Sequence, residues 1–477
     1  MKTKKILTMA ALALTFAACS NDDSDMTAPQ PAEAHGMITV TAKLAPKDVG
    51  TTRAVQDNGD NKITATWAVN EELRIIAAKE SSSFEHEATA TVTAVDGDGA
   101  ATITFNIDDA ARGRKCFIIY PYDAAVTETD GVYTADPITA QTGVLNTSLD
   151  VRIGAGTIQD NGTLDVITQP AAQFAIFKFT VKNPDTSATI NVKSLTVTIG
   201  SQDHVITPAS ATSTLYAALP AVSSQSVGFS ATDSDGKTYF CAKDGVTFSA
   251  GNYYQSTLRM PQYVLMGDGL KWAACNLGAT NPWDYGEYYS WGATATQTIY
   301  DWDNYPHMQA GQSGWDYINK YTFADGQTRG IWYDGDGNFI GDNKTSLADY
   351  DYADDAARQR WGGTWRVPTN DEWAALRNTD NYSWVWTDDY LGDGSNHAGM
   401  VVTCVNGSCA GNSIFLPNAG YYQDAIFFHV GFYWSSSLDT GTNKMSDYAC
   451  GVQFDHNGVL QAFGSRRVGL PIRAVAE

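Results

Sequence analysis

The sequence is poor in basic residues. Its 477 residues include 31 Lys and Arg but 53 Asp and Glu, so the formal net charge at pH 7 is −22. When the chain is divided at residue 260, both halves are acidic. A surface that binds nucleic acid needs clustered Lys and Arg to neutralise phosphates. The composition therefore argues against nucleic acid as a partner.

The motifs of several enzyme classes are also absent from the sequence. There is no G-x-S-x-G nucleophile elbow, no H-E-x-x-H zinc site, no P-loop and no G-x-G-x-x-G dinucleotide fingerprint. The seven histidines are scattered, without the spacing of metal ligands. We therefore expect neither an enzyme nor a bound cofactor. A carbohydrate-active enzyme with catalytic carboxylates stays open as an alternative, because an acidic protein supplies many Asp and Glu.

A long apolar run occurs only at the N-terminus. Three lysines within Met1–Lys5 precede the uncharged, largely apolar Ile6–Ala18, the order of a secretory signal too short to span a bilayer. The ending F-A-A-C resembles a bacterial lipobox, which implies that residues 1–18 are removed and that Cys19 is lipid-modified. Such acylation anchors a protein stably in a membrane. The alternative is ordinary cleavage, with Cys19 an incidental thiol.

The segment behind Cys19 is acidic. Its S-N-D-D-S-D phrase resembles an export tag of Gram-negative surface lipoproteins, which implies an outer-membrane protein exposed at the cell surface; the alternative is a solvated acidic tether. Either way, residues 19–36, with Pro29 and Pro31, are expected to form a disordered linker.

Residues 37–260 contain short alternating runs between turn signals and no convincing helix, the pattern of β-sandwiches. Thr102–Ile107 alternates strictly, and Phe174–Val181 is apolar on both faces, which predicts a buried central strand. A change of register at Ser194–Leu195 predicts a bulge. A weaker break near Ile167–Pro170 predicts two lobes, residues 37–168 and 169–260.

Several phrases in this region occur in the order seen in the fimbrillin family of surface lipoproteins, the subunits of strand-exchange pili, which the region resembles. The resemblance implies two transthyretin-like β-sandwich lobes and strand exchange with other fimbrillin subunits as partners. The matching phrases are T-T-R-A (51–54), T-W-A-V-N-E-E-L-R (66–74), F-I-I-Y-P-Y (117–122), L-Y-A-A-L-P (215–220) and F-S-A-G-N-Y-Y (248–254).

The resemblance also implies protease cleavage between Arg53 and Ala54. In the family, an arginine-specific protease removes the first strand, and the groove that opens receives a strand from another subunit. Here Ile38–Leu44 alternates well enough to be that strand. The alternative is that Arg53 is an uncut loop residue. This chain also departs from the stalk pattern, because a whole domain replaces a free C-terminal donor strand.

The composition changes at Pro261, since every tryptophan except Trp67 lies beyond it. Two helices are predicted there. One covers Tyr352–Trp361, with Asp354 and Asp355 in its first turn. The other begins at Thr369, which forms a capping box with Glu372.

The C-terminal region resembles the Fibrobacter succinogenes major paralogous domain and its relatives, which are similar to C-type-lectin-like folds. Residues 261–477 are therefore expected to form an α+β C-type-lectin-like domain, so that the whole chain is mainly β. The matching phrases are V-L-M-G-D-G-L-K-W-A-A-C-N-L (264–277), Y-Y-S-W-G (288–292), W-G-G-T-W-R-V-P-T-N-D-E-W (361–373), I-F-L-P-N-A-G-Y (414–421), Y-W-S-S-S (433–437) and R-R-V-G-L-P-I-R (466–473).

Two of the remaining cysteines flank a turn. If Asn406–Gly407 is a two-residue hairpin turn, Cys404 and Cys409 face each other at a separation that permits a disulfide. Two reduced thiols are the alternative. The pairing of the other four cannot be deduced from sequence: Cys116, Cys241, Cys275 and Cys450.

Exposed aromatic residues are the candidate ligand-binding groups, because Trp and Tyr stack on sugar rings, although most must serve the domain's own core. Asp349 and Asp351 are weak metal candidates, with helix capping as the competing explanation. The aromatic candidates lie in two segments that mix aromatics with Asp and Asn: Trp302, Tyr305, Trp315, Trp384 and Trp386.

These features together predict a lipid-anchored surface adhesin, a fimbrial tip or accessory subunit that presents its C-terminal domain to glycan or protein ligands. One alternative is a non-polymerising glycan-binding lipoprotein of a polysaccharide-uptake system. A carbohydrate-active enzyme is the third interpretation.

Overall fold

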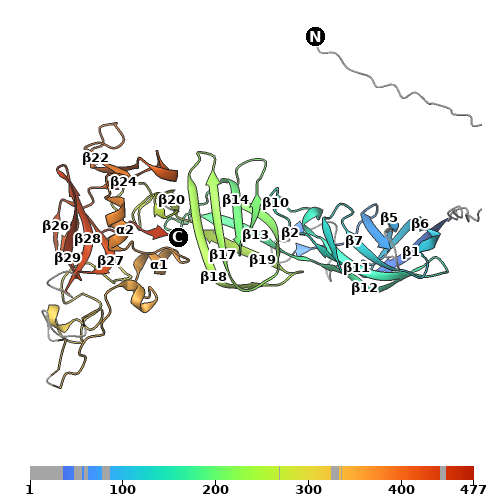
Figure 1. Cartoon of the computed structure of the whole chain (residues 1–477), viewed down its shortest axis with the longest axis horizontal. Helices are drawn as coiled ribbons and strands as arrows, with labels where there is room; N and C mark the ends of the chain where they lie inside the picture. Colours follow the sequence, from blue (N-terminus) through green and yellow to red (C-terminus); the bar gives the residue numbers. More distant parts are fainter. Residues whose placement is uncertain are drawn as a thin grey trace, which may run out of the picture.

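The computed structural model describes residues 36–47, 56–57, 63–77, 86–267, 269–323, 332–334, 336–440 and 447–477. The predicted lipid-attachment residue Cys19 and the predicted cleavage site at Arg53 and Ala54 lie outside these ranges. Figure 1 shows three β-rich bodies in a row, with the first strands at one end and the C-terminal domain at the other. The predicted mainly β fold is confirmed. Among the described residues, no helix has the length and apolar character needed to cross a membrane.

Lobe 1 is built on a seven-stranded antiparallel sheet. In spatial order its strands are β1 (Met37–Leu44), β6 (Ala101–Asp108), β5 (His86–Val95), β4 (Glu72–Ala77), β7 (Lys115–Tyr120), β11 (Arg152–Ile158) and β12 (Leu164–Ala172). Two short hairpins accompany it, β2 (Gln56–Asp57) with β3 (Ile63–Thr64) and β8 (Val126–Thr129) with β9 (Val132–Ala135).

The sheet of lobe 1 curls so that its first and last strands approach each other. The backbone N–H of Thr41 on β1 donates to the carbonyl oxygen of Gly162, just before β12, at 3.2 Å. The alternating pattern predicted for Thr102–Ile107 is confirmed, because Ile103 and Phe105 are buried in the core of this lobe. Strand β1 therefore seals one side of the core and has β6 as its full-length ladder partner.

The predicted boundary between residues 168 and 169 is wrong by a few residues. Strand β12 runs through it without interruption and pairs with β11, so lobe 1 ends at Ala172. Pro170 suggested a break, but a proline is tolerated on an edge strand and at a bulge. Here β12 is the last strand of the sheet, and its register with β11 shifts beside Gly154.

Lobe 2 is a sandwich of two sheets around a core that includes Phe179, Val197 and Phe229. The predicted central strand is confirmed, since β13 (Phe174–Lys182) lies between β16 (Thr214–Pro220) and β19 (Tyr253–Arg259). The facing sheet has a bulge just before the predicted place, as a register shift between Val192 and Ser194 rather than at Ser194–Leu195. The strands of that facing sheet in this lobe are β10 (Ala140–Gln141), β15 (Gln202–Ile206), β14 (Val192–Ile199), β17 (Val222–Asp233) and β18 (Thr238–Phe248).

The facing sheet of lobe 2 continues into the C-terminal domain. Strand β18 pairs through Thr238 and Tyr239 with β20 (Gln262–Leu265). Strand β20 pairs with β21 (Lys271–Ala273), which in turn pairs with the C-terminal strand β30 (Val475–Ala476). The two bodies thus share one hydrogen-bonded ladder.

The C-terminal domain contains the two predicted helices. The second, α2 (Asn370–Leu376), begins after Thr369 with the predicted capping box. The first, α1 (Ala356–Trp361), is four residues shorter than predicted. Tyr352 has a positive φ of 58°, which no helix interior accepts, and Asp355 is the N-cap rather than a residue of the first turn.

The rest of the C-terminal domain consists of short sheets and turns around two aromatic-rich clusters of core residues. Its further strands are β22 (Tyr382–Thr387), β23 (Gly399–Cys404), β24 (Ser413–Pro417), β25 (Tyr421–Gln423), β26 (Ile426–Phe428), β27 (Gly431–Leu438), β28 (Tyr448–Asp455) and β29 (Gly458–Ser465). The described residues also form the 3-10 turns η1 (Asp109–Ala111), η2 (Thr147–Leu149), η3 (Trp315–Tyr317), η4 (Leu347–Tyr350) and η5 (Gly407–Cys409).

Candidate functional site

Helix α2 positions one wall of a cavity in the C-terminal domain. Its capping box fixes Glu372, whose Oε2 accepts the backbone N–H of Thr369 at 2.7 Å. The guanidinium of Arg366 donates to both carboxylate oxygens of Glu372, at 2.6 and 2.8 Å. Burial alone would raise the pKa of Glu372, but these hydrogen bonds outweigh it and hold the pKa below its ordinary value. Glu372 is therefore a charged structural anchor and unsuited to act as a general acid.

A disulfide loop forms the opposite wall. The structure joins Cys404 and Cys409 with an S–S distance of 2.00 Å and a Cα–Cα distance of 5.8 Å. The predicted two-residue hairpin turn is wrong, because the backbone N–H of Cys404 donates to Asn412 rather than pairing across with Cys409. Residues Gly407–Cys409 form the turn η5 instead, since the positive φ of Gly407 starts a longer loop.

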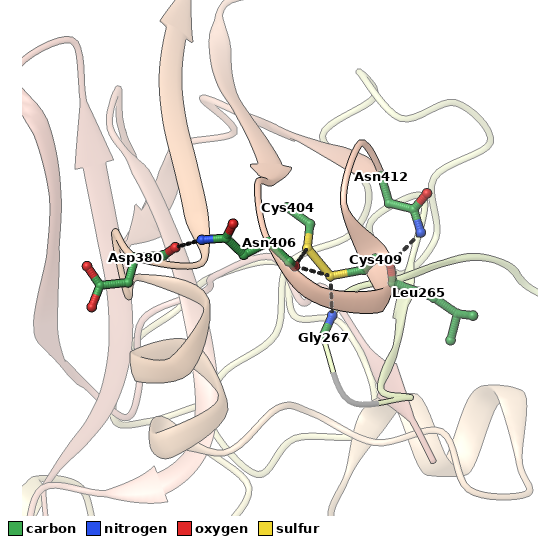
Figure 2. Close-up of a disulfide and its surroundings, with 7 residues drawn as sticks. All are labelled: Leu265, Gly267, Asp380, Cys404, Asn406, Cys409 and Asn412. Atoms are coloured by element: carbon green, nitrogen blue, oxygen red, sulfur yellow. Dashed lines mark hydrogen bonds between the residues drawn. A yellow bond between two sulfur atoms is a disulfide. The ribbon is translucent and has the colours of Figure 1, made fainter.

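The disulfide loop is fixed to neighbouring segments, as Figure 2 shows. The backbone N–H of Gly267 donates to Cys409 Sγ at 3.0 Å, and Asn412 Nδ2 donates to the carbonyl oxygen of Leu265 at 2.9 Å. Asn406 Nδ2 donates to the carbonyl oxygen of Asp380. The loop is therefore held against both the end of β20 and the segment after α2.

Between these walls lies a cavity of about 330 Å³. The buried Trp272 and Tyr382 contribute aromatic surface to it, while amide and hydroxyl groups contribute hydrogen-bonding surface. No Lys, Arg or His belongs to its described lining, so the cavity lacks a cation for an acidic ligand. The lining residues are Met266, Gly267, Leu270, Trp272, Glu372, Ala375, Leu376, Asn378, Asn381, Tyr382, Asn406, Gly407, Ser408 and Cys409.

The predicted aromatic platforms are only partly exposed. Tyr305 is buried, because its hydroxyl donates to the carbonyl oxygen of Trp291 at 2.9 Å and accepts from Arg466. Its prediction as a ligand-binding residue is wrong for this reason. Trp302 packs edge-on against Tyr305, with ring centroids 5.5 Å apart, and remains half-buried. Trp315 is also half-buried, at the start of η3.

Trp384 and Trp386 share one face of β22 with the buried Tyr382. Both pack against the core of the domain and are half-buried rather than fully exposed. Trp384 Nε1 donates to the carbonyl oxygen of Leu376, and Trp386 Nε1 donates to Asp388, each at 2.8 Å. Trp384 and Trp386 lie on β22, whereas Trp302 packs against Tyr305, so the two predicted segments belong to different parts of the domain.

The weak metal candidates have structural roles. Asp349 accepts the backbone N–H groups of Thr345 and Ser346 at 2.7 and 2.9 Å, as the acidic member of a capping box. Asp351 has a left-handed conformation at the end of η4. Among the described residues no group of His, Cys, Asp or Glu side chains is arranged to hold a metal ion. Of the remaining cysteines, Cys275 is partly exposed, and three are free and buried: Cys116, Cys241 and Cys450.

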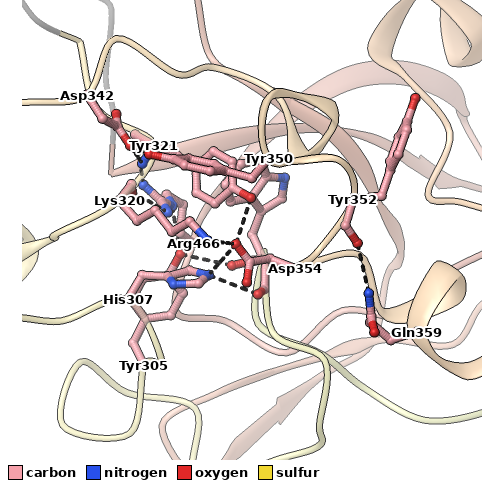
Figure 3. A network of polar contacts seen from close by, with 12 residues as sticks. Tyr305, His307, Lys320, Tyr321, Asp342, Tyr350, Tyr352, Asp354, Gln359 and Arg466 are labelled. Carbon is pink, nitrogen blue, oxygen red and sulfur yellow. Dashed lines mark hydrogen bonds and ion pairs between the residues drawn. The ribbon is translucent and has the colours of Figure 1, made fainter.

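A buried polar network around Arg466 was not found from sequence (Figure 3). The Arg466 side chain is fully enclosed, and its Nε donates to Tyr305 at 2.8 Å. Its remaining nitrogens donate to the carbonyl oxygens of Tyr321 and Lys320 at 2.9 and 3.1 Å. In the sequence, Arg466 is marked only by the R-R-V-G phrase, and that phrase does not indicate where its side chain points. The network joins Arg466 to described residues of the segment between β21 and α1, namely Tyr305, Lys320 and Tyr321.

His307 and Asp354 belong to the same network. His307 Nε2 lies 2.9 Å from the carbonyl oxygen of Gly292 and 3.9 Å from Asp354 Oδ2. Burial, with the charge of Arg466 close by, lowers the pKa of His307 to about 4. Hydrogen bonds from Lys320 and Tyr321 outweigh the burial of Asp354 and keep its pKa below the ordinary value. At neutral pH the pair is thus a neutral imidazole beside a carboxylate.

Comparison with known proteins gives structural likeness at low identity. The chain is similar to a fimbrial protein from Bacteroides ovatus, at 12% identity and a TM-score of 0.25, over 93% of this chain and 99% of that one. It is also similar to a protein from Bacteroides uniformis assigned to cell adhesion, at 15% identity and a TM-score of 0.27, over 48% and 93% of the two chains. No family model and no curated protein matches. TM-scores this low do not establish a shared fold, and they carry no argument about function.

Proposed function

We propose that this chain is a cell-surface lipoprotein that acts as an adhesin, a fimbrial tip or accessory subunit that presents its C-terminal domain to a ligand. The observation that carries the proposal is the linear arrangement of the three bodies. Strand β1, which follows the proposed lipid anchor at Cys19, lies at one end, and the domain with the cavity lies at the other (Figure 1). An anchor at the first end leaves the cavity-bearing end farthest from the membrane.

The C-terminal strand supports a terminal or accessory position. Val475 and Ala476 of β30 are fully buried and paired with β21. Val475 also exchanges two backbone hydrogen bonds with Arg366, each of 2.9 Å. A subunit that donates a C-terminal strand to its neighbour needs that strand free. Strand β30 is therefore held within its own subunit and is not free to act as a donor strand.

The cavity beside the Cys404–Cys409 disulfide is the ligand site we propose. Its volume and mixed aromatic and amide lining suit a small hydroxyl-rich group such as one or two sugar units. Catalysis there is not supported, because both oxygens of the lining carboxylate Glu372 already accept hydrogen bonds from Arg366. Binding without turnover is the activity that fits this arrangement.

A glycan array probed with the full mature chain tests this site. Ser408 is exposed and lines the cavity, so Ser408→Trp should fill the cavity and abolish binding. Ala410 is exposed on the same loop outside the lining, so Ala410→Trp is the matched control and should bind like the parent. Equal binding by both variants would show that the ligand binds outside this cavity. Turnover of a bound glycan would favour the interpretation as a carbohydrate-active enzyme.

The fimbrial role has a separate test. Treatment of the purified protein with an arginine-specific protease should give a mature chain that begins at Ala54 and co-assembles with stalk fimbrillins. A chain that stays intact and never co-assembles, yet binds glycan, would instead support the non-polymerising surface lipoprotein.

A further inference from the structure

Lys47 is a buried lysine at the exit of strand β1. Its side chain is 2% exposed, and its Nζ lies 3.3 Å from Glu71 Oε2 and 3.6 Å from Asp150 Oδ2. Two aromatic rings enclose the ammonium group. The ring centroid of Tyr120 is 3.5 Å from Nζ, and that of Trp67 is 4.2 Å away.

The neighbours of Lys47 are fixed by their own hydrogen bonds. The hydroxyl of Tyr120 donates to Glu71 Oε1 at 2.6 Å. Arg152 Nε donates to Asp150 Oδ1 at 2.8 Å, and Arg152 also donates to the backbone carbonyl oxygen of Lys47 at 2.9 Å. The Asp150 side chain is 3% exposed and that of Glu71 is 14% exposed. The amine of Lys47 and the carboxylates of Asp150 and Glu71 thus lie close together in a site that is largely shielded from water.

We propose that Lys47 and Asp150 form an intramolecular isopeptide bond, with Glu71 as the proton carrier. The ε-amine attacks Cγ of Asp150, and a C–N bond replaces the bond from Cγ to Oδ2. Glu71 accepts a proton from the Lys47 nitrogen and passes it to Oδ2. Two protons of the ammonium leave with Oδ2 as one water, so atoms and charge balance and no oxidant or reductant is needed.

The surroundings favour each part of this step. Burial lowers the pKa of Lys47, against the opposing effect of Asp150 and Glu71, and so raises the fraction of nucleophilic amine. Arg152 stays on Oδ1, the oxygen that carries negative charge in the tetrahedral intermediate and becomes the amide oxygen. Groups held close to attack distance react as if at very high concentration. The product replaces two buried charges by a neutral amide and so removes part of the desolvation cost.

The bond would have a consequence for strand β1. Lys47 follows β1 and Asp150 precedes β11, so the link joins the first strand to the body of lobe 1. A cut after Arg53 would then leave the N-terminal segment, with any lipid on Cys19, covalently attached. A linked chain would keep β1 in its groove and could not take a donor strand there, so only an unlinked chain could co-assemble in that way. The linked chain would serve as an accessory subunit that stays on the membrane. The bond itself does not depend on the ligand of the C-terminal domain.

Intact-mass measurement of the purified, denatured full-length mature protein tests the bond. We expect a mass one water below that calculated for the mature chain with its lipid and its disulfide. Proteolytic digestion should yield a branched peptide that joins Lys47 to Asp150. A parent protein at full mass, or a water loss that maps elsewhere, would overturn the proposal, and Lys47 would then be only a buried ion-pair partner.

Variants assign the roles of the residues. Glu71→Gln keeps the shape of the side chain but cannot take up a proton, and it should restore the full mass while circular dichroism stays unchanged. The matched control is Lys43→Ala, since Lys43 forms an exposed ion pair with Asp96 at 2.9 Å and should leave the mass loss intact. A Glu71→Gln protein that still loses water would remove Glu71 from the mechanism.

Discussion

Trp365 donates its indole N–H to the backbone carbonyl oxygen of Phe240 at 3.1 Å, across the boundary between the C-terminal domain and lobe 2. Two residues earlier, Gly363 has a φ of 59°, and a Cβ placed on it would lie 2.5 Å from the carbonyl oxygen of Ala242. The W-G-G-T-W phrase is therefore a docking element. It joins the domain to strand β18 as well as ending helix α1.

Gly363→Ala should weaken this docking. The left-handed conformation costs a non-glycine residue roughly 1 kcal/mol, and the contact with Ala242 adds a steric cost that backbone movement must relieve. We expect lower thermal stability and faster protease cleavage near Pro261, the start of the C-terminal domain.

Gly362→Ala is the matched control for Gly363→Ala. Gly362 also has a positive φ, of 71°, but a Cβ placed on it meets nothing within 4 Å. Because its ψ of −167° lies outside the left-handed helical region, Gly362→Ala should lose stability through backbone strain alone and keep the protease resistance of the parent. If both variants behaved alike, the approach of Gly363 to Ala242 would not matter for docking.

His307 should make the stability of the C-terminal domain depend on pH. An unfolded histidine binds a proton near pH 6.5, whereas burial lowers the pKa of His307 to about 4. Between these values the unfolded state binds more protons, so this contribution is present above pH 6.5 and is lost as the pH falls to about 4. This difference between the unfolded and folded pKa values of His307 corresponds to a loss of unfolding free energy on the order of 3 kcal/mol.

Denaturant unfolding from pH 7.5 to pH 4 checks the contribution of His307. Asp355 acts in the opposite sense, because burial raises its pKa to about 6 and its proton stabilises the folded state as the pH falls. The test is therefore the difference between the parent and His307→Gln, which should shrink toward low pH. His429→Gln, at an exposed histidine, should leave the pH profile unchanged.

The features that were predicted correctly depend on neighbours in the sequence. The Thr369–Glu372 capping box follows from residues three positions apart, and the central position of β13 follows from apolar residues on both of its faces. Features that depend on distant partners were missed. Tyr305 is buried because Arg466 reaches it from far along the chain, and the cavity exists because the disulfide loop meets the end of β20. Local sequence patterns do not predict such contacts between segments that are far apart in the chain.

Loss of the disulfide should affect the cavity more than the fold. Cys404 and Cys409 are separated by 5 positions in the sequence, so the loop they close is short, and chain entropy predicts a loss of about 2 kcal/mol for Cys404→Ser with Cys409→Ser. Because Gly267 donates to Cys409 Sγ, the same change frees one wall of the cavity. We expect glycan affinity to fall at least tenfold while the far-ultraviolet circular dichroism is kept. Unchanged affinity would show that the wall does not need the bond.

Trp302 and Tyr305 should separate binding from stability. Tyr305→Phe removes a hydroxyl that accepts from Arg466 and donates to Trp291, so it should cost roughly 1–3 kcal/mol of unfolding free energy. Ligand affinity should not change, since the hydroxyl is enclosed. Trp302→Ala removes a half-exposed ring and should cost less stability. Titration calorimetry with Trp302→Ala then tests the Trp302 segment as a second contact for the glycan. A lower affinity would show that this segment contacts the ligand in addition to the cavity. An unchanged affinity would show that, of these two places, only the cavity beside the disulfide binds the ligand.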